Sequence, residues 1–146
     1  MSSYAPITLR VVDENGKELF RQSIPFEWEI DVKQVMERAF ILSQSAATPD
    51  PLVYTLQYYG YSEAAQFPGY LGYEIESIFT KPNNQQFYWE LLIDGVASQE
   101  GADSEQPGPG ATVLWQYTPL PANQQGTSRR SRLVQSRRAA GRTSRA

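Results

Sequence analysis

The chain has no histidine and no cysteine, so it lacks the commonest general base and the commonest transition-metal ligand, and its carboxylates become the first candidates for chemistry. Paired carboxylates can transfer protons or bind hard cations. The carboxylates gather in the second half of the chain, at Glu74, Glu76, Glu90, Asp94, Glu100, Asp103 and Glu105. No spacing among them holds two at a catalytic separation, so we interpret them as a solvated face.

Catalytic and metal-binding motifs do not occur in the sequence. Asp13-Glu14-Asn15-Gly16 departs from a calcium loop, because its glycine comes too early and the twelfth-position glutamate is missing. The Pro- and Gly-rich residues 107–110 lack the Lys-Ser/Thr that follows a phosphate-binding loop. Neither Gly-x-Ser-x-Gly nor His-Glu-x-x-His is present. We therefore predict no catalytic residues, no metal site and no enzymatic activity.

Aromatic side chains crowd one predicted loop. Residues 58–61 read Tyr-Tyr-Gly-Tyr and residues 67–70 read Phe-Pro-Gly-Tyr. Exposed aromatic clusters in loops mark binding surfaces, although the loop could instead fold back over an open end of the sheet. A further surface candidate lies on a later strand, on the face opposite a predicted core tryptophan. The predicted ligand- or partner-binding residues are Tyr59, Tyr61, Phe67, Tyr70 and Tyr88.

The C-terminal tail differs in charge from the rest of the chain. Residues 1–127 carry six Lys and Arg against 16 Asp and Glu, a net charge of −10, whereas residues 128–146 carry seven arginines and no acid. Three interpretations stay open: phosphate contacts with nucleic acid, docking on an acidic partner or on another copy, and a solvated tail. The predicted tail contacts are Arg129, Arg130, Arg132, Arg137 and Arg138.

The length of 146 residues fits one domain and a tail. We place the domain at residues 1–118. Residues 119–146 have few apolar groups to bury, which predicts disorder. No stretch approaches the roughly 20 apolar residues of a membrane span, and the N-terminus does not resemble a signal peptide. We expect a cytoplasmic protein without a membrane span.

Local patterns predict the elements of the first half. Two strands, within residues 7–11 and 17–24, flank the hairpin signal Asn15-Gly16. Asp31 is a helix N-cap with Gln34 as its capping-box partner, and the helix should reach about residue 45. Its apolar face consists of Val32, Val35, Met36, Ala39 and Phe40.

The second half reads as strands. Alternation predicts strands at residues 52–59, 73–80, 87–93 and 112–118, with a loop at 60–72 and a break at 81–84. Strand parity places Trp89 and Trp115 in the core. One helix packed across a mixed sheet, after an N-terminal hairpin, predicts an α+β fold of β-grasp type.

Residues 5–118 resemble the C-terminal domain of transcobalamin and intrinsic factor, and the bacterial domains of unknown function grouped with it. The matching motifs, in order, are Gly72-Tyr73-Glu74-Ile75-Glu76-Ser77-Ile78, Tyr88-Trp89-Glu90-Leu91, Asp94-Gly95 and Gly101-Ala102-Asp103. The last motif matches at Gly110 and Trp115, but Ala111 stands where the family has an acidic residue.

The resemblance implies a β-grasp module that binds a soluble ligand, or caps one bound by a partner, without catalysis. In transcobalamin-like proteins this domain covers a corrinoid, so a corrinoid is implied by the resemblance alone, and we predict no cofactor from the residues. Two alternatives remain: a nucleic-acid-associated or assembly protein acting through its arginine tail, and an accessory subunit of an enzyme complex held by an exposed strand edge.

Overall fold

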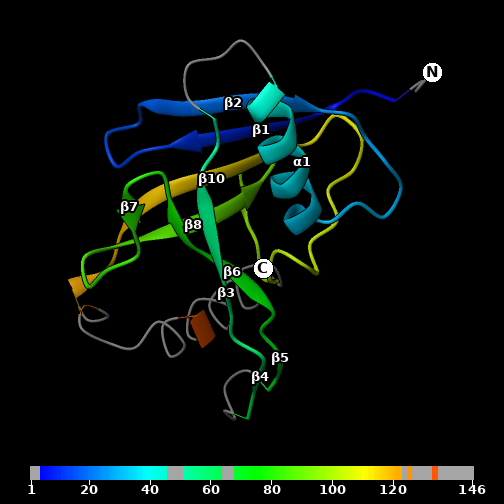
Figure 1. The fold of residues 1–146 in the computed structure, drawn as a ribbon. Coiled ribbons are helices and arrows are strands. Elements are labelled where there is room, and N and C mark those ends of the chain that lie inside the picture. The colour runs from blue at the N-terminus through cyan, green and yellow to red at the C-terminus, as the bar shows by residue number, and fades with distance from the viewer. Residues whose placement is uncertain (1–3, 46–50, 64–67, 123–124, 126–132, 135–146) are drawn as a thin grey trace.

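The structure is a computed structural model that describes residues 4–45, 51–63, 68–122, 125 and 133–134. Eleven elements follow one another along these residues, and Figure 1 labels all of them except β9. In chain order they are β1 (Ile7–Val12), β2 (Glu18–Ile24), α1 (Val32–Ser45), β3 (Tyr54–Tyr58), β4 (Tyr61–Ser62), β5 (Gly69–Tyr70), β6 (Tyr73–Ile78), β7 (Lys81–Pro82), β8 (Phe87–Ile93), β9 (Val96–Ala97) and β10 (Thr112–Pro119). The predicted α+β class is confirmed.

The main sheet has five strands in the order β2-β1-β10-β8-β9. Strand β1 runs parallel to β10, with Leu9 opposite Val113, and the other pairs are antiparallel. The predicted hairpin at Asn15-Gly16 joins β1 to β2, and Gly16 has a φ of 81°. Asp13 stabilises this turn, because its carboxylate accepts the backbone N–H groups of Asn15 and Lys17, both at 2.9 Å.

Helix α1 packs one face against the main sheet. Its predicted capping box is confirmed: the N–H of Gln34 donates to Asp31 Oδ1 at 2.8 Å, and the N–H of Asp31 donates to Gln34 Oε1 at 3.0 Å. Four residues of the predicted apolar face are buried, but Phe40 is 43% exposed. Ser43, one turn later, is buried, and its Oγ accepts the N–H of Leu52 at 2.9 Å, which ties the helix to the segment that follows.

The core lies between the inner face of the main sheet and α1, and it extends to Ile75 and Ile78 of β6. Trp89 and Trp115 are fully buried there, as predicted. The indole of Trp89 donates to the carbonyl of Lys81 at 2.7 Å, so its one polar group is satisfied.

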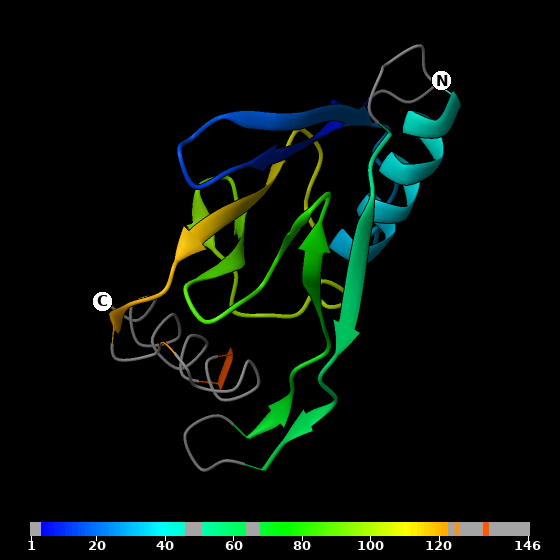
Figure 2. The same ribbon diagram turned by 60° about the vertical axis from the view of Figure 1, so that its left-hand side comes forward.

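The predicted mixed sheet is divided in the structure. Strands β3, β6 and β7 form a separate three-stranded sheet, and β4 pairs with β5 in a short hairpin. The prediction of a loop over residues 60–72 and of a break at 81–84 therefore missed three two-residue strands, which are too short to show a period of two. Figures 1 and 2 show the β4–β5 hairpin projecting away from the main sheet.

The described residues include the predicted domain boundary at residue 118 but only a few residues of the predicted tail. Strand β10 ends at Pro119, and Leu120 beyond it is buried. Leu133 and Val134 pack against Leu71 and Tyr59. The predicted disorder otherwise falls outside the described residues and stays a prediction. No helix in the described part of the chain is long and apolar enough to cross a membrane.

Candidate functional site

Four tyrosine rings gather where the three-stranded sheet meets the β4–β5 hairpin. We call Tyr58, Tyr61, Tyr70 and Tyr73 the tyrosine surface. The ring of Tyr58 lies 4.9 Å from that of Tyr73 and 6.2 Å from that of Tyr70, and Tyr61 lies 4.9 Å from Tyr70. Tyr58 is 48% exposed and Tyr61 is 66% exposed. These spacings are those of favourable aromatic pairs, yet half of the cluster faces solvent.

Strand pairing brings the four rings together. Tyr58 is opposite Tyr73 in the β3–β6 ladder, and Tyr61 is opposite Tyr70 in the β4–β5 hairpin. The chain changes direction at Gly60 and Gly72, which have φ values of 63° and 71°. The carbonyl of Gly60 accepts the N–H of Leu71 at 2.7 Å, so the two ladders are held to each other at this point.

Asp103 holds Tyr70 and Tyr73, the two half-buried members of the tyrosine surface, in place. Its Oδ2 accepts the hydroxyl of Tyr70 at 2.5 Å, and its Oδ1 accepts the N–H of Tyr73 at 3.0 Å. The hydrogen bond to Asp103, together with desolvation, raises the pKa of Tyr70 well above its usual value. Tyr70 is therefore a hydrogen-bond donor at neutral pH, and its ring is held in one orientation.

The Gly-Ala-Asp step joins the tyrosine surface to helix α1. The N–H of Ala102 donates to Tyr73 O at 2.8 Å, and Ala102 O accepts the N–H of Lys33 at 2.9 Å. A Cβ at Gly101 would lie 2.6 Å from the carbonyl oxygen of Leu71, so only glycine fits this approach. The Nζ of Lys33 lies 5.4 Å from the centre of the Tyr73 ring. The step thus has a structural role in the module.

The structure separates the predicted contact residues. Tyr61 and Tyr70 belong to the tyrosine surface, whereas half-buried Tyr59 packs against Leu71 and its hydroxyl lies 3.4 Å from Glu76 Oε2. Tyr88 lies in β8 of the main sheet, opposite Thr118. Phe67 and the arginines Arg129, Arg130, Arg132, Arg137 and Arg138 lie outside the described residues. Binding by any of these residues stays a prediction.

Three members of this site were not among the predicted contact residues: Tyr58, Tyr73 and Asp103. Tyr58 belongs to the aromatic residues 58–61, but its meeting with Tyr73 depends on the pairing of β3 with β6, which the pattern within one strand does not predict. Asp103 appears in the Gly101-Ala102-Asp103 motif, but nothing local links it to Tyr70, which lies 33 residues earlier. The interpretation of the carboxylates as one solvated face was wrong for Asp103, which is half-buried, and for Glu74, which is 5% exposed.

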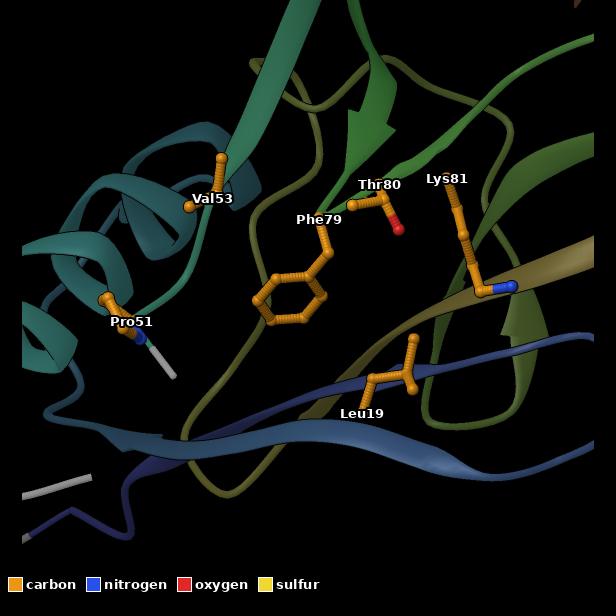
Figure 3. A pocket seen from close by; sticks show the side chains of 6 residues that line it. All are labelled: Leu19, Pro51, Val53, Phe79, Thr80 and Lys81. Atoms are coloured by element: carbon orange, nitrogen blue, oxygen red, sulfur yellow. The ribbon is translucent and has the colours of Figure 1, made fainter. Parts of the chain in front are cut away.

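A cavity of about 450 Å³ lies elsewhere, between the main sheet and the start of β3. Figure 3 shows the side chains that line it: Leu19, Pro51, Val53, Phe79, Thr80 and Lys81. Phe79 has a φ of 53°, and its N–H donates to Val53 O at 2.8 Å. The Nζ of Lys81 forms an ion pair with Glu14 at 3.0 Å. The cavity can take an apolar group, while its cation already has an acidic partner.

The described residues contain no cluster of three or more His, Cys, Asp or Glu side chains that could bind a metal ion. The carboxylates near the tyrosine surface are engaged with the fold, as Asp103 illustrates. The arrangement can therefore present aromatic rings and hydroxyl groups to a partner.

Comparison with known proteins gives a fold relationship. No family model matches the chain, and no curated protein sequence matches it. Among solved structures, it is similar to haptocorrin, a member of the transcobalamin family, in complex with Cbi, with a TM-score of 0.54 and 20% sequence identity. The match covers 81% of this chain and 26% of the haptocorrin chain, so the chain spans about a quarter of that protein's length. This likeness shows a distant relationship of fold, in agreement with the fold that the sequence motifs imply.

Proposed function

We propose that this chain is a non-enzymatic binding module that contacts a protein partner through the tyrosine surface. The supporting observation is the packing of four tyrosine rings around a hairpin, with Tyr58 and Tyr61 largely exposed. Tyrosine offers a large apolar ring with a polar tip and only two side-chain torsions, so it is enriched at protein interfaces. A module of this kind acts by recognition, with no bond made or broken.

Preorganisation of the surface adds to the argument. Asp103 binds both Tyr70 and the backbone of Tyr73, and the hairpin is joined to the three-stranded sheet at Gly60. Side chains already held in place lose less conformational freedom when a partner binds. Tyr61 is then the most exposed residue of a surface in which Asp103 holds Tyr70 and Tyr73 in place.

The shape of the hairpin favours a protein over a small ligand. The hairpin projects from the molecule (Figures 1 and 2), whereas small-molecule sites are concave. The haptocorrin structure contains Cbi, so a corrinoid is the other ligand class to test. With no histidine in the sequence, this chain cannot offer an imidazole to cobalt.

The test compares three forms of the full chain: wild type, Tyr61→Ala and Tyr88→Ala. Each is immobilised and exposed to an extract of the source cells, and retained proteins are quantified by mass spectrometry. We expect a defined protein to be retained by the wild type and by the Tyr88→Ala control, and to be lost with Tyr61→Ala. Far-ultraviolet circular dichroism checks that both variants fold.

A parallel titration with cobinamide, followed by intrinsic fluorescence, distinguishes the two ligand classes. Saturable binding of cobinamide that disappears in Tyr61→Ala would show that the tyrosine surface binds a corrinoid and not a protein. Retention of the same proteins by wild type and Tyr61→Ala would contradict a role for the tyrosine surface.

A further inference from the structure

Strand β3 has an open edge. It pairs with β6 on one side, and no strand pairs with its other side in the described part of the chain. The N–H of Phe79 donates to Val53 O at 2.8 Å, and the N–H of Tyr59 donates to Gly72 O at 2.9 Å, so the residues flanking β3 bond toward the β6 side. The β3–β6 ladder shifts register between Thr55 and Leu56, but the extra residue, Glu76, belongs to β6. Backbone groups therefore alternate along β3, which directs the N–H and C=O groups of Tyr54, Leu56 and Tyr58 outward.

The open edge carries no charge. From Pro51 to Ser62 the sequence contains no Asp, Glu, Lys or Arg, and the side chains of Thr55 and Gln57 are exposed. Natural proteins block exposed edges with charged side chains, proline or bulges. One edge strand of the main sheet, β2, follows that rule, because Arg21 stands at its centre and Glu18 at its start; the other, β9, is only two residues long.

The sequence of β3 is complementary to itself. It reads Tyr54-Thr55-Leu56-Gln57-Tyr58. If two copies pair antiparallel with Leu56 opposite Leu56, each Tyr54 lies opposite Tyr58 of the second copy, and each Thr55 lies opposite Gln57. Aromatic and polar cross-strand pairs of this kind stabilise antiparallel ladders. The same operation on β2 would place Arg21 opposite Arg21, which is repulsive.

We infer that a second copy of this chain is the partner of the β3 edge. The two β3 strands pair about a two-fold axis at Leu56, and the two three-stranded sheets become one continuous sheet. The outward N–H and C=O groups of Tyr54, Leu56 and Tyr58 form the ladder, and the Gln57 side chain releases the Tyr58 carbonyl that it holds at 3.2 Å.

The association is weak, because one five-residue strand forms the contact. Contacts that bury less surface than a standard interface belong to transient complexes. Self-association therefore depends on protein concentration and leaves the tyrosine surface residue Tyr61 outside the ladder.

The experiment uses charge reversal at Thr55 and Gln57, whose exposed side chains face each other across the proposed axis. A Thr55→Lys/Gln57→Lys chain puts lysines opposite lysines, and a Thr55→Glu/Gln57→Glu chain puts glutamates opposite glutamates. Sedimentation velocity over about two decades of concentration should show dimer for the wild type and monomer for each variant alone. An equimolar mixture of the two variants should restore the dimer. Ser23→Lys on the exposed part of β2 is the matched control, and it should dimerise as the wild type does.

A second readout locates the contact. Hydrogen exchange at the Leu56 amide should slow as the concentration of wild-type protein rises, while exchange at Thr55 stays unchanged. A wild type that stays monomeric over the whole range would overturn the inference, as would a lysine variant that dimerises normally, or a mixture that does not dimerise. Tyr61→Ala leaves β3 intact, so loss of partner retention in that variant and loss of the dimer are separate results.

Discussion

Two aromatic groups of this molecule have nearly the same ring spacing and opposite exposure. In the main sheet, Tyr117 lies 4.8 Å from Trp89 and 5.1 Å from Phe87, and its hydroxyl donates to Pro82 O at 2.6 Å. On the tyrosine surface, rings also lie 4.9 Å apart, but Tyr61 is 66% exposed. Ring packing alone therefore does not separate a core from a contact surface. Solvent exposure does separate them. It predicts that the rings of the first group stabilise the fold and that those of the second group contact a partner.

The largest expected difference in the free energy of unfolding is that between Trp89→Ala and Tyr61→Ala. Removing the buried indole leaves a cavity and removes its hydrogen bond to the Lys81 carbonyl, so the free energy of unfolding should fall by about 3–5 kcal/mol. Tyr61→Ala should change it by no more than about 0.5 kcal/mol, since the side chain is mostly exposed. Urea unfolding followed by circular dichroism measures both. Equal losses in the two variants would remove the distinction between the regions.

Gly72→Ala tests the turn that holds the tyrosine surface. Gly72 has a φ of 71°, and a Cβ there would collide with the carboxylate of Asp103. Backbone strain and collision together should cost about 2 kcal/mol of unfolding free energy. Gly95→Ala is the matched control, because Gly95 has a φ of 83° with open space around it, and it should cost about 1 kcal/mol. If both glycines gave the same loss, the approach of Asp103 to the turn would be unimportant.

A double-mutant cycle with Asp103→Ala and Tyr70→Phe tests whether Asp103 holds Tyr70 in place. Each single variant should lose about 1–2 kcal/mol of unfolding free energy. The double variant should lose less than the sum by at least about 0.5 kcal/mol, because both changes remove the same hydrogen bond. Additive losses would argue that the two side chains act independently.

Alkaline pH should cause a smaller loss of stability, which also depends on the hydrogen bond between Tyr70 and Asp103. Desolvation raises the pKa of Tyr54 to about 12, and the Asp103 hydrogen bond raises the pKa of Tyr70. Above the ordinary tyrosine pKa of 10.0 the unfolded chain loses these protons while the folded chain keeps them, so stability is full below pH 10 and falls as pH rises above it. Urea unfolding between pH 9 and pH 11 should show a shallower fall in Tyr70→Phe than in the wild type. An identical pH profile would count against the hydrogen bond to Asp103.

Much of the fold could be predicted because its signals are local. The Asp31 capping box, the Asn15-Gly16 turn and the parity of Trp89 and Trp115 depend on neighbours a few residues away. The candidate site was predicted less well. Tyr61 and Tyr70 were named for their aromatic loop, while Tyr58 and Tyr73 were missed because their meeting depends on strand pairing.

The sequence by itself determined the helix, the long strands, their order and the inward placement of Trp89 and Trp115, since period and turn chemistry act within a few residues. The tertiary structure alone decided that Asp103 holds Tyr70 from 33 residues away and that Glu74 is buried. It also decided that β3 has one open edge. Such contacts depend on how the sheets are placed relative to each other, and that placement is set by burial of the whole core, which no single segment encodes.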